Sequence, residues 1–116
     1  MSKEIELHVG GTFDDMARRA ADAWHRAEKG EAVRENHLTF VGWDVFSRTM
    51  TTKRLELLRH LHRHPAASIA ALARSLGRDY RRVYEDVEIL TKAGLIEQND
   101  EGLSAGYDEI KTVIAL

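Results

Sequence analysis

Cationic and aromatic side chains are concentrated in residues 77–90, which read GRDYRRVYEDVEIL. The cluster consists of Arg78, Tyr80, Arg81, Arg82 and Tyr84. An arginine guanidinium group is a planar fork of N–H donors that pairs with phosphate oxygens or with the acceptor edge of guanine. Tyrosine hydroxyls and the N–H groups of a helix start also suit phosphate oxygens. These residue types therefore favour contacts with phosphates and base edges.

The charge of the chain is unevenly distributed around this cluster. The 116 residues carry a formal net charge of −2. Residues 53–92 hold nine lysines and arginines against five acidic residues, a formal charge of +4. Residues 93–116 hold one lysine against five acidic residues, a formal charge of −4. A basic middle and an acidic end in so short a chain indicate a polar partner for the middle.

Two helices with a short turn between them are predicted to position the cluster. Ser68 is a good N-cap for a helix over residues 69–76, and Gly77 closes that helix. Asp79 then caps a longer helix over residues 80–93. Its apolar positions recur at helical spacing and are expected to face the core: Val83, Val87 and Leu90. The cluster is thereby placed on the first turns of the second helix.

The remaining elements are expected to support these two helices. A leucine-rich helix is predicted over residues 53–64 after Thr51 or Thr52, with Leu55, Leu58 and Leu61 inward. The hairpin that follows the longer helix is predicted from residues 95–98 and 103–105. The other predicted elements are strands over residues 5–9, 37–41 and 110–116, a helix over residues 12–29 and a short helix over residues 43–50.

This order of elements predicts an α+β fold. Residues 37–116 are expected to form a winged helix-turn-helix domain, because three helices with short gaps precede a small hairpin. Residues 1–36 are expected to belong to an N-terminal strand–helix–strand extension that serves dimerisation, with the domain boundary near residues 31–36.

The sequence also resembles a known family. The segments that carry the resemblance are LTFVGWDVFSRTMTTKRLELLRHL, SIAALARSLGRDYRRVYEDVEILTKAGLI and YDEIK. They are similar to a family of predicted winged-helix transcriptional regulators, itself distantly similar to the multiple-antibiotic-resistance repressor type. The resemblance runs from residue 38 onward and is most specific over residues 78–96. It implies binding to double-stranded DNA and a homodimer. Some members are thought to be antitoxins that also repress and that act beside a toxin-like protein partner.

The resemblance implies DNA-contacting roles for particular residues. Ser68 matches the family's helix-start position, and the reading-helix positions are matched by Arg78, Tyr80, Arg81, Arg82 and Tyr84. Arg81 and Arg82 are expected to reach base edges from the first turn of the helix. Lys53 and Arg54, at the front of the preceding helix, are expected to contact phosphates of any DNA sequence.

Two alternatives to DNA binding stay open. The cluster could be a solvated helix face that makes i,i+4 ion pairs, such as Arg81 with Glu85. The same fold could also be a protein-interaction module, for example an antitoxin that covers a partner toxin, with DNA binding secondary or absent. Fold by itself does not separate these functions.

Metal binding, catalysis and cofactor use are not indicated by the sequence. His60 and His64 lie one helical turn apart and could both ligate a metal, but a polar helix end suits histidine as well. The chain has no cysteine, and no nucleophile–base pair is recognisable, so we expect neither an enzyme nor a bound cofactor. The sequence has no signal-peptide pattern, and we expect a cytoplasmic protein.

Overall fold

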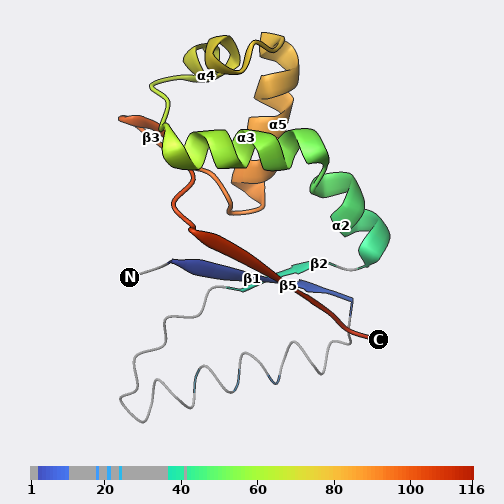
Figure 1. Ribbon diagram of the computed structural model, residues 1–116. Helices are drawn as coiled ribbons and strands as arrows, with labels where there is room; N and C mark the ends of the chain where they lie inside the picture. The colour runs from blue at the N-terminus through green and yellow to red at the C-terminus, as the bar shows by residue number, and fades with distance from the viewer. Residues whose placement is uncertain (1–2, 11–17, 19–20, 22–23, 25–36, 41) are drawn as a thin grey trace. The chain divides into compact units, whose positions relative to one another are not determined.

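The computed structural model describes residues 3–10, 18, 21, 24, 37–40 and 42–116. The described chain is an α+β protein, which confirms the predicted class (Figure 1). Its internal contacts divide it into two compact units. The first unit is Met1–Lys3 with Ser47–Glu109, and the second is Glu4–Phe46 with Ile110–Leu116. The boundary predicted near residues 31–36 lies outside the described residues, and the two units divide at other positions.

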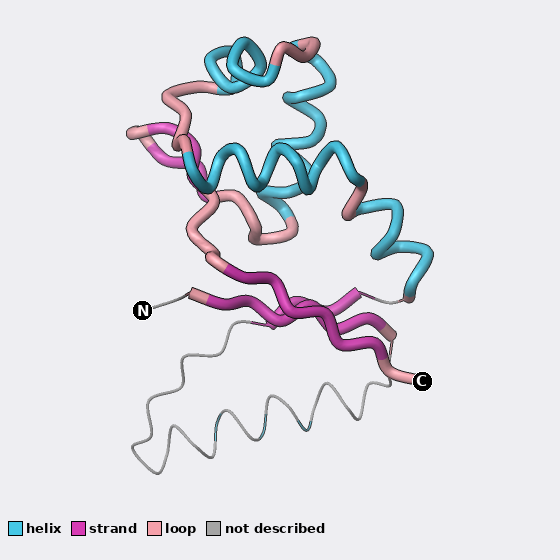
Figure 2. The backbone as a smooth tube through the Cα atoms, viewed as in Figure 1, coloured by secondary structure: helices cyan, strands magenta, loops and turns pink. Residues whose placement is uncertain are grey.

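Three helices of the first unit begin where the sequence predicts (Figure 2). They are α3 (Thr52–Arg63), α4 (Ile69–Leu76) and α5 (Tyr80–Lys92). In each, a side-chain oxygen of the N-cap residue accepts a hydrogen bond from the backbone N–H three residues later. The caps are Thr51, Ser68 and Asp79. Each cap satisfies one of the N–H groups that a helix start leaves without an intrahelical acceptor.

A tight turn at Gly77 sets α5 against α4. Gly77 has φ 63° and ψ 35°, and its N–H donates to the carbonyls of Ala73 and Arg74. This left-handed conformation is accessible to glycine without the steric cost that a Cβ would bring. The chain therefore reverses within a few residues, and α5 packs against α4.

The core of the first unit contains the face of α5 that the sequence predicts. Val83, Val87 and Leu90 are fully buried. On α3 the prediction was partly wrong, because Leu57 is buried with Leu58 and Leu61 while Leu55 is half-buried. α3 also packs against a later strand, β4 (Gly102–Ser104), and its buried face includes Leu57 in place of Leu55.

The predicted hairpin is formed by β3 (Glu97–Asn99) and the antiparallel β4 (Gly102–Ser104). β3 begins two residues later than predicted, because the N–H groups of Leu95 and Ile96 both bond to the Leu90 carbonyl and close α5. Reciprocal backbone bonds of 3.0 and 2.8 Å join Ala66 to Leu103. The hairpin is thereby tied to the connection between α3 and α4.

The second unit contains a three-stranded sheet in the order β2-β1-β5. Its strands are β1 (Glu4–Val9), β2 (His37–Phe40) and β5 (Glu109–Ile114). β1 and β2 are parallel, with Glu6 opposite His37 and Val9 opposite Phe40. All three strands match predicted ones, and the helical part of the first unit is inserted in the sequence between β2 and β5.

The other helices of the sequence lie partly outside the described residues or at the surface. Within the predicted helix over residues 12–29, Arg18, Ala21 and Trp24 are helical, and the rest lies outside the described residues. The short predicted helix is α2 (Trp43–Thr49), and none of its residues is buried. Trp24 and Trp43 are 67% and 57% exposed, so neither belongs to the core. In the described part of the chain, no helix has the length and apolar character needed to span a bilayer.

Candidate functional site

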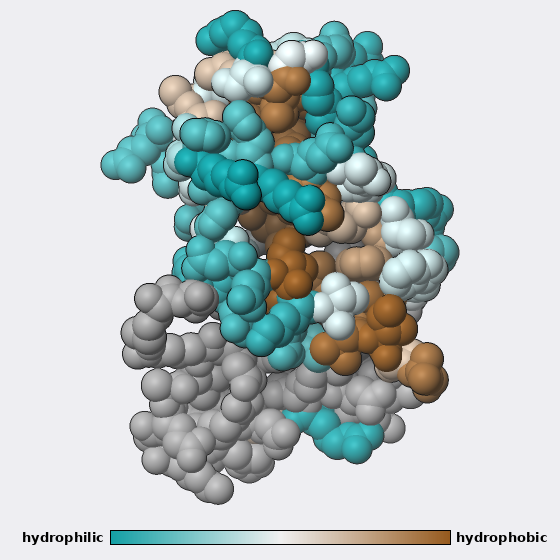
Figure 3. Space-filling view, in the orientation of Figure 1, coloured by the Kyte–Doolittle hydropathy of each residue, from teal (hydrophilic) through white to brown (hydrophobic). Residues whose placement is uncertain are grey.

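The first turns of α5 present the predicted cluster to solvent. Tyr80, Arg81, Arg82 and Tyr84 are all exposed, and the Arg81 side chain is 89% exposed. The two tyrosine rings lie one turn apart, with their centroids separated by 6.2 Å. Figure 3 shows mostly hydrophilic residues over the upper part of the view, where α4 and α5 lie. The helix thus has one fully buried face and one exposed face rich in cations and aromatic rings.

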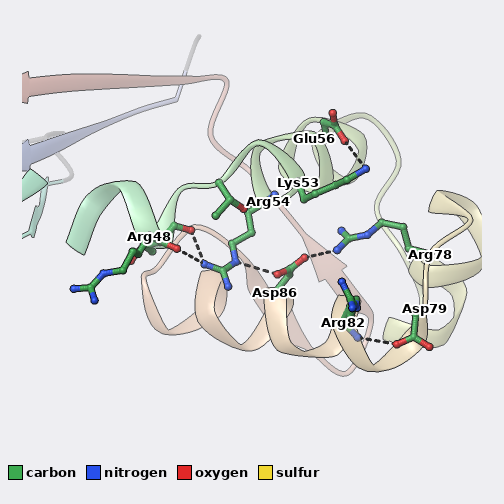
Figure 4. Close-up of polar contacts among 10 residues, drawn as sticks. Arg48, Lys53, Arg54, Glu56, Arg78, Asp79, Arg82 and Asp86 are labelled. Carbon is green, nitrogen blue, oxygen red and sulfur yellow. Dashed lines mark hydrogen bonds and ion pairs between the residues drawn. The ribbon is translucent and has the colours of Figure 1, made fainter. Parts of the chain in front are cut away.

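A buried carboxylate on the same helix binds two of the predicted DNA-contacting arginines. Asp86 accepts a hydrogen bond from Arg54 Nε at 2.9 Å through Oδ1. Its other oxygen, Oδ2, accepts one from Arg78 Nη2 at 2.7 Å. The Asp86 side chain is 13% exposed, so both contacts are partly shielded from water (Figure 4). Each is a charge-assisted hydrogen bond, the stronger kind of hydrogen bond in proteins.

Arg54 makes further contacts within the protein. Its guanidinium also donates from Nη1 to the carbonyls of Arg48 and Thr49, at 2.8 and 2.9 Å. The side chain is 16% exposed. Arg54 therefore joins the end of α2, the start of α3 and the middle of α5, and its donors face inward. These contacts give Arg54 an internal, structural role, and its contact with phosphates stays a prediction.

Asp86 was missed by the sequence reasoning, although a signal for it exists. It lies three residues after Val83 and four before Leu90, on the stripe of α5 that faces the core. A charged side chain on a buried stripe needs an opposite charge and hydrogen bonds, because its desolvation is otherwise costly. Its position therefore implied a cationic partner, which Arg54 and Arg78 provide.

Four of the predicted residues line one open groove between α3 and α5. Its volume is about 410 Å³. The cations in its wall are Lys53, Arg78, Arg81 and Arg82, and the carboxylates are Asp79, Glu85 and Asp86. Lys53 Nζ lies 3.8 Å from Glu56, and Arg81 Nε lies 3.9 Å from Glu85 Oε1. Exposed pairs at such distances contribute little to stability, so the cations can exchange them for another anion.

The remaining predicted site residues lie outside this groove wall. The Ser68 hydroxyl accepts a hydrogen bond from the Ala71 N–H at 3.1 Å, which is the N-cap contact of α4. Tyr80 and Tyr84 are exposed on α5 but are not among the lining residues. The structure therefore brings Lys53 together with Arg78, Arg81 and Arg82, and it places Ser68 at the helix start that the sequence predicts.

The histidines of α3 make contacts of their own. The rings of His60 and His64 have centroids 5.2 Å apart. His62 contacts the Ala105 carbonyl through Nδ1 at 2.6 Å and the Asp108 carboxylate through Nε2 at 3.1 Å. Among the described residues, no three side chains of the metal-binding types form a group that could hold an ion.

Comparison with known proteins identifies the family of the chain. The HVO_A0114 family model matches residues 49–112, more than half of the chain. The chain therefore belongs to the HVO_A0114 family, and the matched residues include α3, α4, α5, the hairpin and the groove. No curated protein and no solved structure matches the chain.

Proposed function

We propose that this protein is a winged helix-turn-helix regulator that binds double-stranded DNA in a sequence-specific manner and acts as a repressor. The observation that carries the proposal is the two-faced α5. Its Val83, Val87 and Leu90 are fully buried, whereas Tyr80, Arg81 and Tyr84 on its first turns are exposed. DNA-reading helices of this kind present their N-terminal residues to base edges.

The order of the elements supports this fold assignment. α4, the Gly77 turn and α5 have the layout of a helix-turn-helix, and the β3–β4 hairpin follows in the position of a wing. The resemblance to winged-helix regulators, which rests most heavily on residues 78–96, agrees with this order.

The exposed residues suggest a division of roles. Arg81 has the exposure and the fork of donors needed to pair with guanine in the major groove. Lys53 lies at the start of α3 with its side chain exposed, which suits a phosphate contact. Asp86, Arg54 and Arg78 would maintain the angle between α3 and α5, so that both contacts reach the same duplex.

A homodimer formed through the second unit would complete the proposed repressor. β5 forms one edge of the described sheet, and its Val113 and Ile114 are exposed. Figure 3 shows hydrophobic residues at the surface near the C-terminal end of the chain. Exposed strand edges and apolar patches are common sites of chain association. Two reading helices about 34–36 Å apart would reach successive turns of the major groove.

The decisive experiment is a polarisation titration with duplexes from upstream of the protein's own gene and with scrambled duplexes of equal length. We expect tighter binding to one upstream duplex, and loss of that preference in Arg81→Ala. Arg59→Ala is the matched control, because Arg59 is an exposed arginine of α3 that does not line the groove. Equal affinities for all duplexes, or no detectable binding of any duplex at low salt, would refute sequence-specific binding. Sedimentation of a stable monomer at micromolar concentration would refute the dimer.

A protein-interaction module, such as an antitoxin that covers a toxin-like partner, is the second candidate. One observation favours it: two of the three cations of the cluster already have acidic neighbours. Asp86 pairs with Arg78, and Glu85 lies near Arg81. This candidate would be selected by two results together: an affinity for a protein partner that does not change with salt, and an affinity for DNA that does not change with salt.

A further inference from the structure

One nitrogen atom of an arginine that lines the groove has donors without an acceptor. Arg78 donates from Nη2 to Asp86, but its Nη1 is buried and has no hydrogen-bond partner among the described residues. The side chain as a whole is 20% exposed. Buried donors in folded proteins nearly always have a partner, because desolvation without one is costly. Because this nitrogen is itself shielded from solvent, an anion in the groove reaches it only when the Arg78 guanidinium moves.

The carboxylates of the groove are largely occupied by internal contacts. Both oxygens of Asp86 are used by Arg54 and Arg78. Asp79 accepts the Arg82 N–H through Oδ2 at 3.3 Å as the cap of α5. Cations outnumber carboxylates in the lining, and the Arg82 guanidinium has no ion pair within 4.0 Å in the described part of the chain. The cap contact leaves the negative charge of Asp79 in place, so the four cations of the lining exceed its three carboxylates by one positive charge.

These cations approach from separate parts of the chain. Lys53 belongs to the first turn of α3, Arg78 to the turn before α5, and Arg82 to the first turn of α5. All three line the groove, and Figure 4 shows Arg78 directed at Asp86 and Lys53 directed at Glu56. Like charges converge in this way at some cost, which a bound anion with several acceptor oxygens would offset.

We propose that this groove binds a single phosphate group, held by Lys53, Arg82 and Arg78, and that the Arg78 guanidinium turns toward the groove so that its buried Nη1 donates to the phosphate. A phosphate has several acceptor oxygens in a tetrahedral arrangement, so it can accept from all three residues at once. The group could be a phosphodiester of DNA or the phosphate of a free small molecule. Only the first source rests on the proposed DNA-binding function. The assignment gives Arg82 a phosphate instead of the base edge that the sequence suggests.

The test uses the full chain and inorganic phosphate as the probe, at constant ionic strength maintained with chloride. Binding is followed by calorimetry and by the NMR signals of the arginine Nε–H groups. We expect saturable binding that shifts the Arg78 and Arg82 signals. Arg82→Gln should weaken it about tenfold or more, the scale of one charge-assisted bond. Arg59→Gln is the matched control and should bind as the wild type does.

If circular dichroism shows that Arg82→Gln is unfolded, Lys53→Gln is used as the second variant. Lys53 is exposed on α3, so its loss should weaken phosphate binding without unfolding the chain. The proposal is overturned by a phosphate titration that matches the chloride blank. It is equally overturned when the folded groove variant binds phosphate as tightly as Arg59→Gln.

A competition arm distinguishes the two sources of the phosphate. Displacement of inorganic phosphate by a bound duplex supports a DNA phosphodiester in the groove. Simultaneous binding of phosphate and duplex supports a free phosphate-bearing ligand. Tight specific DNA binding with no phosphate binding would overturn the groove proposal and leave the proposed function standing. Phosphate binding without any DNA binding would overturn the proposed function and leave the groove proposal standing.

Discussion

Arg54 on α3 and Asp86 on α5 are 32 residues apart in sequence and are joined by a hydrogen bond of 2.9 Å between Nε and Oδ1. Both side chains are mostly buried, and the contact fixes the start of α3 against the middle of α5. The exposed face of α5 and Lys53 of α3 therefore have a defined spacing, which any partner that contacts both helices would depend on.

Replacing Arg54 should destabilise the fold. Arg54→Ala removes the Asp86 contact and the bonds to the carbonyls of Arg48 and Thr49. We expect the free energy of unfolding to fall by about 1.5–3 kcal/mol, the usual range for a lost hydrogen bond to a charged group. Urea unfolding measures it, with Arg59→Ala as the exposed control. Similar midpoints for the two variants would contradict the structural role of Arg54.

Gly102 should not tolerate a side chain. Its φ is 125°, and a Cβ at this position would overlap the carbonyl oxygen of Ala66. Gly102→Ala should therefore lower the free energy of unfolding by more than about 1 kcal/mol, because the strained backbone and the overlap both oppose folding. Amide exchange should also accelerate at Leu103, whose N–H bonds to Ala66.

Gly106→Ala is the matched control for this prediction. A Cβ at Gly106 would meet only the Lys3 Nζ atom at 3.8 Å, an ordinary contact. Its melting curve should overlay that of the wild type. Equal stability of the two glycine variants would count against the close packing of the hairpin.

Arg81 should affect recognition and leave stability unchanged. Its side chain is 89% exposed, so Arg81→Ala removes no buried contact. If Arg81 pairs with a guanine, the variant should lose about 1–3 kcal/mol of specific binding and should relax the preference at one base pair. Paired melting curves and titrations on single-base variants of the duplex measure both effects. Unchanged discrimination at every base pair would assign the cluster to a solvated face.

The affinity for DNA should fall steeply with salt. Because Arg54 is used internally and Arg81 is assigned to a base edge, the cations assigned to phosphates in each protomer are Lys53, Arg78 and Arg82. For a dimer with about three contacts per half, the slope of log affinity against log salt should be about −5. Lys53→Ala should weaken binding to all sequences alike and should make the slope shallower by about one unit per half-site. A slope near zero is incompatible with DNA binding through this surface.

Zinc should not stabilise the protein through its histidines. His60 and His64 have adjacent rings, but the described residues place no third ligand with them. A stable zinc site takes four ligands in structural proteins. One equivalent of zinc should therefore leave the melting temperature unchanged in the wild type and in the variant with both histidines replaced by alanine. A rise that only the wild type shows would establish a metal site.

Local signals in the sequence determined most of the secondary structure. Ser68 and Asp79 were recognisable as helix caps, and Thr51 as one of two candidates, because a cap depends on a side chain and a backbone N–H only three residues away. The buried face of α5 followed from the spacing of Val83, Val87 and Leu90, because helical periodicity alone groups them. The cations at the start of α5 could be read directly from the sequence.

Only the tertiary structure decided which of these cations are available to a ligand. Arg54, Arg78, Arg81 and Arg82 look alike in the sequence, yet Arg54 pairs with Asp86 outside the groove, whereas the other three line the groove. The pairing of Arg54 with Asp86 exists only once α3 and α5 pack together. An arginine carries the same charge in either setting, and its role depends on whether packing brings a buried carboxylate within reach, which no local pattern of residues encodes.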